Sequence, residues 1–89
     1  MTVGKRVCYS GRVQGVGFRY TAQHLAAGYR VAGYVCNLPD GDVELVAEGD
    51  ADEVERFLAA VAGHMAPNIA CTTVRDEPPA GRQGFQIRH

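Results

Sequence analysis

Apolar residues along this chain follow a helical spacing in some segments and an alternating, strand-like spacing in others. The order of these segments limits the possible fold more than any other feature of the sequence. Two segments, one beginning at Phe18 and one after Asp50, space their apolar residues three and four positions apart, as amphipathic helices do. Five other stretches favour strands, because they hold β-forming residues that in part alternate with polar ones. We therefore predict helices over about residues 18–27 and 51–62, and strands over about residues 3–10, 31–37, 42–48, 69–76 and 85–87.

Short-range signals indicate where the helices begin and end. Gly28 is a natural stop for the first helix and Gly63 for the second. Asp50 is followed three residues later by Glu53, a spacing that resembles a capping pair at a helix start. These signals predict that the second helix lies between Asp50 and Gly63.

Turn residues complete the order of the elements. Leu-Pro-Asp-Gly at residues 38–41 predicts a hairpin, and Pro-Pro-Ala-Gly at residues 78–81 a turn before the last strand. The order β-α-β-β-α-β plus a short terminal strand is that of the ferredoxin-like split βαβ sandwich. In this α+β fold two helices cover one face of a mostly antiparallel sheet. A chain of 89 residues can close one modest core, so we expect a single domain over residues 1–89.

Charge and hydropathy exclude several classes of partner. Nine Lys+Arg against ten Asp+Glu give a formal net charge of -1, without the broad positive field that collects nucleic acid. No apolar run approaches the roughly 18 residues of a membrane span, and the start of the chain does not resemble a signal peptide. We therefore expect a cytoplasmic protein that binds neither nucleic acid nor membrane.

The three cysteines, Cys8, Cys36 and Cys71, are odd in number, far apart and outside any C-x-x-C pair. This pattern predicts neither a disulfide framework nor a zinc site. We expect buried thiols, with a single disulfide between two of the three as an open alternative.

The predicted topology brings two distant segments together. The first two strands are joined through a helix and run in the same direction, so the loop after the first and the end of the second share one edge of the sheet. Residues 11–19 should therefore face residues 35–41 across one intervening strand, a gap of roughly 10 Å. Asn37 has the parity of Val31 and Val35, which places its side chain on the helix-covered face.

The segment that precedes the first helix is rich in glycine. Successive N–H groups in such a loop can bind an anion, and the helix dipole strengthens that binding. Arg19, in the first helical turn, would add a planar donor matched to two phosphate oxygens. A Walker loop is absent, and Tyr20 stands where G-x-G-x-x-G requires a glycine. These features favour a phosphate site over a nucleotide site, although glycine spacing alone fits a plain strand-to-helix turn equally well.

Two stretches resemble the acylphosphatase family. Its signature G-R-V-Q-G-V-x-F-R is matched by residues 11–19 without a gap, and G-[WY]-V-x-N-x-x-D-G-x-V is matched by residues 33–43. The resemblance implies that Arg19 binds the phosphate and that Asn37 orients the attacking water. The implied phosphate cradle also includes the loop residues Gln14, Gly15, Val16, Gly17 and Phe18.

The activity implied by the resemblance is hydrolysis of the carboxyl-phosphate bond of acyl phosphates to a carboxylate and inorganic phosphate. A carboxylate leaves without protonation, and a loose phosphoryl transition state needs mainly charge stabilisation and an aligned nucleophile. We therefore expect no metal and no cofactor, inorganic phosphate as product and inhibitor, and a monomer. Met-Ala-Pro at residues 65–67 departs from the family, which usually has Gly-Pro there, at a place remote from the expected site.

Two functions without catalysis stay open as alternatives. Ferredoxin-like sheets can bind RNA through exposed aromatic residues, here Tyr9, Tyr34 and Phe85, although the RNA-recognition signature is absent. The other is a regulatory domain like the acylphosphatase-like segment at the front of large carbamoyltransferases, an alternative that the 89-residue length disfavours.

Other chemically active side chains are expected to have no catalytic role. We interpret His24, His64 and His89 as solvated histidines on a helix flank, near a helix end and at the terminus. Cys36 adjoins Asn37 but has the opposite parity, so we interpret it as a packed thiol.

Overall fold

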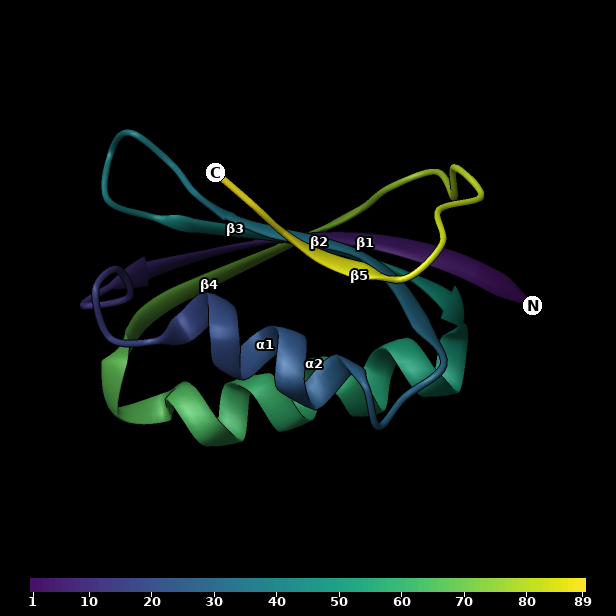
Figure 1. Ribbon diagram of the computed structural model, residues 1–89, viewed down its shortest axis with the longest axis horizontal. Coiled ribbons are helices and arrows are strands. Elements are labelled where there is room, and N and C mark those ends of the chain that lie inside the picture. Colours follow the sequence, from purple (N-terminus) through teal and green to yellow (C-terminus); the bar gives the residue numbers. More distant parts are fainter.

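The computed structural model describes residues 1–89 and contains a five-stranded sheet with two helices on one of its faces (Figure 1). This arrangement confirms the predicted α+β ferredoxin-like fold. Neither helix is long and apolar enough to span a membrane. The elements in chain order are β1 (Thr2–Gly11), α1 (Phe18–Ala26), β2 (Val31–Asn37), β3 (Val43–Asp50), α2 (Ala51–Met65), a 3₁₀ turn (Ala66–Asn68), β4 (Ile69–Asp76) and β5 (Phe85–Arg88).

The strand order β4-β1-β3-β2-β5 fixes which loops meet. β3 lies between β1 and β2 and is antiparallel to both, so β1 and β2 run in the same direction as predicted. β5 pairs with β2 in parallel, with Cys36 opposite Arg88. Figure 1 shows the β1–α1 loop and the β2–β3 turn at the same end of the molecule, and the chain ends on that side as well.

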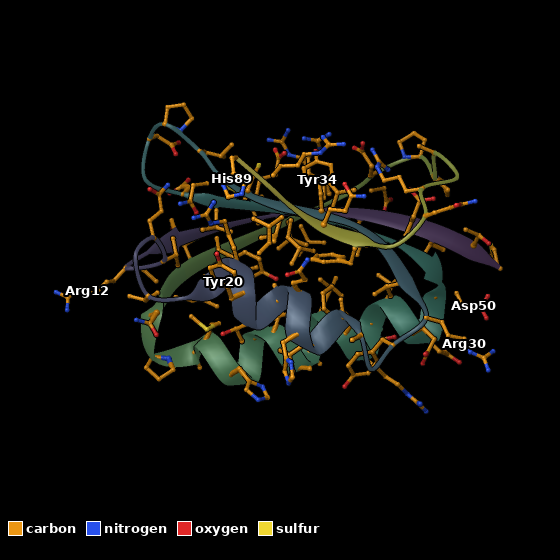
Figure 2. The ribbon with its side chains drawn as sticks, viewed as in Figure 1. Arg12, Tyr20, Arg30, Tyr34, Asp50 and His89 are labelled. Carbon is orange, nitrogen blue, oxygen red and sulfur yellow. The ribbon has the colours of Figure 1, made fainter.

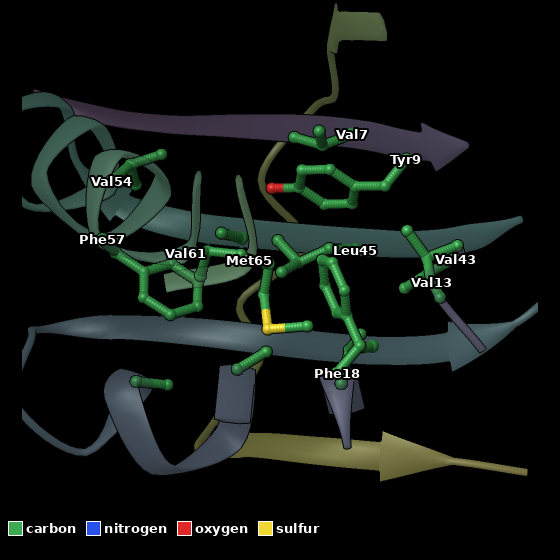
Figure 3. Close-up of a cluster of buried hydrophobic side chains, with 14 residues drawn as sticks. Val7, Tyr9, Val13, Phe18, Val43, Leu45, Val54, Phe57, Val61 and Met65 are labelled. Atoms are coloured by element: carbon green, nitrogen blue, oxygen red, sulfur yellow. The ribbon is translucent and has the colours of Figure 1, made fainter. Parts of the chain in front are cut away.

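The core fills the space between the helices and the sheet (Figure 3). Alternate residues of β1 and β3, such as Val7, Tyr9 and Leu45, point into it and are almost fully buried. Phe18, the first residue of α1, packs against Tyr9 with 4.9 Å between the ring centroids. Because this aromatic pair joins the start of α1 to β1, burial of Phe18 fixes where the helix begins.

The second helix begins at Ala51 as predicted, but it ends later than predicted and lacks the expected cap. Gly63 does not end it, because the helix continues to Met65, which is buried in the core. The expected capping pair is also wrong, since Asp50 makes no side-chain cap bond. Asp50 lies 3.5 Å from the N-terminal ammonium, and Glu53 Oε1 accepts a hydrogen bond from the Arg30 N–H at 3.0 Å.

The cysteines are all free thiols. Cys8 and Cys36 are partly buried, but the expectation of a buried thiol is wrong for Cys71, which is exposed on the edge strand β4. Cys36 lies on the sheet face opposite the helices. Burial, with the nearby Glu44 carboxylate, raises the pKa of the Cys36 thiol above its usual value. A protonated thiol on the face away from the core fits its interpretation as a non-catalytic residue.

Glu48 holds the long connection between β4 and β5 against the uncovered face of the sheet. Only 5% of this residue is exposed, and its carboxylate accepts hydrogen bonds from the N–H groups of Ala80, Gly81 and Arg82 at 2.9 to 3.1 Å. The Arg82 guanidinium adds an ion pair at 2.7 Å. Burial opposes ionisation, but the donated hydrogen bonds outweigh it and lower the pKa of Glu48.

Replacing Glu48 with glutamine should therefore destabilise the protein by about 2 kcal/mol at pH 7, since it removes charged hydrogen bonds and leaves Arg82 without its partner. Because the pKa of Glu48 is lower in the folded than in the unfolded protein, this contribution is complete above the ordinary glutamate pKa of about 4.3. It is lost as the pH falls through the lowered value. Urea unfolding at pH 7 and pH 3 measures both effects.

Glu55→Gln is a matched control for this experiment, because Glu55 is exposed on α2 and forms no ion pair. Its urea midpoint should stay at the wild-type value at both pH values. Equal midpoints for Glu48→Gln and Glu55→Gln at pH 7 would show that the Glu48 carboxylate does not stabilise the fold.

Candidate active site

A small cavity lies where the β1–α1 loop, the first turn of α1 and the end of β2 meet. Its volume is about 170 Å³, and it contains Asn37 from β2 and Arg19 from α1. The remaining lining residues are Val13, Gly15, Gly17, Phe18 and Tyr20. Two segments about twenty residues apart in sequence therefore share one cavity, as the topology predicted.

A larger hollow, of about 610 Å³, lies around Met1, Arg30 and Asp50. Figure 2 shows Arg30 and Asp50 at the opposite end of the molecule from Arg12, which belongs to the β1–α1 loop. The lining of this larger hollow combines exposed arginines with the acidic residues at the start of α2. This mixture of opposite charges on an open surface gives it no converging set of functional groups.

The β1–α1 loop is anchored on both sides of its glycines. Val13 and Phe18 are both buried in the core, and the Arg12 N–H donates a 2.9 Å hydrogen bond to the Asn68 carbonyl in the 3₁₀ turn. Between these anchors Gly15 and Gly17 have φ angles of 74° and 78°, in the left-handed region that favours glycine. Space around both is open, so backbone conformation rather than crowding requires glycine there.

The backbone N–H groups of residues 15–20 donate to no acceptor within the protein. The first amide used by the helix is that of Thr21, which donates to the Gly17 carbonyl at 2.9 Å. Free amides at a helix N-terminus carry partial positive charge, and α1 has no acidic residue in its first turn to compensate it. This end of the cavity therefore suits an anion.

Arg19 adds a full positive charge to the cavity. None of the ion pairs in the protein includes Arg19. Its only side-chain contact of hydrogen-bond length is from Nη1 to Nδ1 of His89, at 3.3 Å. A guanidinium without a carboxylate partner, beside free amides, can bind two oxygens of a phosphate group.

His89 is exposed, as expected for a solvated terminal histidine, but its ring also contacts Arg19. The parallel pairing of β5 with β2 explains its place, since it directs the end of the chain toward the edge where β2 ends at Asn37. The sequence held a usable signal for this contact, because a terminal strand beside β2 in the same direction would end at the candidate site.

Asn37 is the last residue of β2 and pairs with Val43 of β3. It has the parity of the fully buried Val35, and it lines the cavity, so its side chain is on the helix-covered face as predicted. Its side-chain amide forms no hydrogen bond within the protein. That amide can therefore accept and donate hydrogen bonds to a water molecule in the cavity.

Gln14 and Val16, two residues of the expected cradle, do not line the cavity. Gln14 Nε2 instead donates to the carbonyls of Leu38 and Asp42, each at 2.8 Å. These bonds link the β1–α1 loop to the turn that follows Asn37. The Gln14 side chain thus holds the two halves of the site together, a role that sequence analysis missed because it depends on the turn's backbone conformation.

The chain is similar in sequence to acylphosphatases over nearly its whole length. The family model described as Acylphosphatase matches residues 5–87. A protein named acylphosphatase from Thermococcus kodakarensis is 45% identical over 80 residues, which are 86% of each chain. Another from Methanospirillum hungatei is 42% identical over 81 residues, or 89% of each chain. The crystal structure of acylphosphatase from Bacillus subtilis superposes with a TM-score of 0.87 and 34% identity, covering 100% of both chains.

Proposed function

The chain belongs to the acylphosphatase family and hydrolyses the carboxyl-phosphate bond of acyl phosphates, and we propose that Arg19, the loop amides and Asn37 carry out this reaction. The observation that supports these roles is that an unpaired guanidinium, free amides and an unbonded asparagine side chain share one cavity of about 170 Å³. Each group has hydrogen-bonding capacity that the protein itself does not use.

In the proposed complex the phosphoryl group of the substrate occupies the cavity. The N–H groups of residues 15–20 and the Arg19 guanidinium donate hydrogen bonds to its non-bridging oxygens. The amide donors are fixed before substrate binds, because Val13, Phe18 and Gln14 hold the loop in place. Preorganised donors stabilise charge in a phosphoryl transition state without a further reorganisation cost.

Asn37 positions the nucleophile in this mechanism. Its side-chain amide holds a water molecule in line with the bond that breaks, and the water oxygen attacks phosphorus. The bond between phosphorus and the carboxyl oxygen breaks, and its electron pair leaves with the carboxylate. The protons of the water remain with the phosphate product. Because the leaving group is a stable carboxylate, no general acid is required.

Hydrolysis of benzoyl phosphate by the purified protein in EDTA tests this proposal. We expect turnover to be unchanged by the chelator, since the cavity lining has no histidine, cysteine or carboxylate to act as a metal ligand. Inorganic phosphate should inhibit competitively, because it occupies the same cradle. Activity that disappears in EDTA and returns with Mg²⁺ or Zn²⁺ would contradict the proposed metal-free mechanism.

The aromatic residues do not support the RNA-binding alternative. Tyr9 faces the core on the helix-covered side, whereas Tyr34 lies on the other face and is only 6% exposed. The Arg88 guanidinium covers the Tyr34 ring at 3.8 Å from its centroid. These two strand tyrosines therefore offer a base no exposed surface on which to stack. We therefore propose a small-molecule substrate and no binding of nucleic acid. The proposal retains the expectation of a cytoplasmic monomer.

A further inference from the structure

The cavity is too small to hold an acyl phosphate with a bulky acyl group together with the attacking water. Sites for small molecules usually have volumes of about 300 to 1,000 Å³, whereas this one has about 170 Å³. In the proposed function the phosphoryl group and the attacking water occupy it. A bulky acyl group must then extend outside the cavity, against the residues that form its rim.

Exposed apolar residues gather at that rim. Four large apolar residues of the chain are exposed, namely Met1, Val16, Tyr20 and Val74. Tyr20 lines the cavity with 68% of its surface exposed, and Val16, at 37%, lies between the two lining glycines. Of the other two, Met1 is the chain terminus and Val74 lies on the edge strand β4, away from the site.

Nothing within the protein explains the exposure of Tyr20. Its hydroxyl forms no hydrogen bond and its ring takes part in none of the aromatic or cation–π pairs. Single exposed apolar residues are common and need no explanation. Tyr20 and Val16 differ from such single residues, because both lie beside the candidate phosphate site. Together they offer an apolar surface at the place where the acyl group leaves the cavity. In Figure 2 Tyr20 lies at the first turn of α1.

We infer that Tyr20, with Val16, binds the acyl group of the substrate, so that the protein prefers acyl phosphates with an aromatic or bulky apolar acyl group to those with a short one. This inference rests on the proposed function, which places the phosphoryl group in the cavity. The side chain of Tyr20 acts in specificity, whereas its backbone N–H belongs to the phosphate cradle.

The test compares kcat/KM for benzoyl phosphate and acetyl phosphate in matched variants. Wild-type protein should favour benzoyl phosphate, and Tyr20→Ala should lower the benzoyl-to-acetyl ratio by about 5- to 10-fold, the worth of one aromatic contact. The loss should appear mainly in KM, because the contact is the same in the ground and transition states. Alanine favours helix, so α1 should keep its first turn.

Val74→Ala is the control, because it removes another exposed apolar side chain, one that lies away from the cavity on β4. It should leave the ratio at the wild-type value, and Tyr20→Phe should retain the ratio because the ring provides the contact. Equal losses on both substrates in Tyr20→Ala, or no change on either, would overturn the inference.

Inhibition by inorganic phosphate separates this inference from the proposed function. Phosphate has no acyl group, so its inhibition constant in Tyr20→Ala should stay within about 2-fold of wild type; a larger rise would place Tyr20 in phosphate binding and overturn the inference. Wild-type protein that hydrolyses neither substrate and is not inhibited by phosphate would instead contradict the proposed function itself.

Discussion

Arg19→Ala is expected to lower kcat/KM for benzoyl phosphate by about 10³-fold, the lower end of the effects of arginines that stabilise phosphoryl transition states. KM should rise and kcat should fall together, because the guanidinium binds the phosphoryl group in both the ground state and the transition state. No other cationic side chain lines the cavity, so no neighbour can replace it. Steady-state kinetics over a range of substrate concentrations separates the two parameters.

Arg19→Lys should recover little of the lost activity. An ammonium group is a point charge and cannot donate two parallel hydrogen bonds as the planar guanidinium does. Arg56→Ala is the matched control, since Arg56 is an exposed arginine of α2 that does not line the cavity. Its one ion pair, with Glu53 at 3.9 Å, is long. It should retain wild-type kinetics. An Arg19→Ala protein that is folded and within a few-fold of wild type would remove Arg19 from the mechanism.

Asn37→Ala should lower kcat by about 10²- to 10³-fold, equivalent to about 2.7 to 4 kcal/mol, if its amide resembles other preorganised hydrogen-bonding groups in active sites. KM should stay within a few-fold of wild type, because Asn37 holds the water and not the substrate. The contrast with Arg19→Ala, in which both parameters change, is the signature of the two proposed roles.

Asn68→Ala is the control for this variant, because Asn68 is the only other asparagine and does not line the cavity. Its kcat should be close to that of wild type. Urea unfolding should accompany all five variants, and midpoints should move little because Arg19 and Asn37 both lie outside the buried core. A folded Asn37→Ala protein with nearly full kcat would contradict a water-positioning role.

The parts of the fold that sequence analysis could predict are those set by repeated patterns. Alternation in β1 and β3 gave the correct core face, since residues such as Val7 and Leu45 are buried. The strand order follows from right-handed connections and short turns, and it placed the β1–α1 loop beside the end of β2. The parity of Asn37 with Val35 then sufficed to put both on the helix-covered face.

The parts that could not be predicted depend on single contacts between distant segments. Gly63 is of a residue type that often ends helices, but burial of Met65 extends the helix past it. Glu48 alternates with apolar residues as a solvated side chain would, and only the folding back of residues 80–82 buries it. Gln14 belongs to the matched signature, yet its bonds to the β2–β3 turn are visible only in three dimensions.

The most direct test of the proposed mechanism is the fate of the water oxygen. Benzoyl phosphate hydrolysed by the wild-type protein in H₂¹⁸O, with Arg19→Ala as the blank for uncatalysed hydrolysis, gives two products that mass spectrometry can examine separately. Attack on a phosphoryl group held by Arg19 predicts one ¹⁸O atom in the inorganic phosphate and none in the benzoate. Label in the benzoate would show that water attacks the carbonyl carbon, and would contradict the placement of the phosphorus atom in line with the Asn37 water.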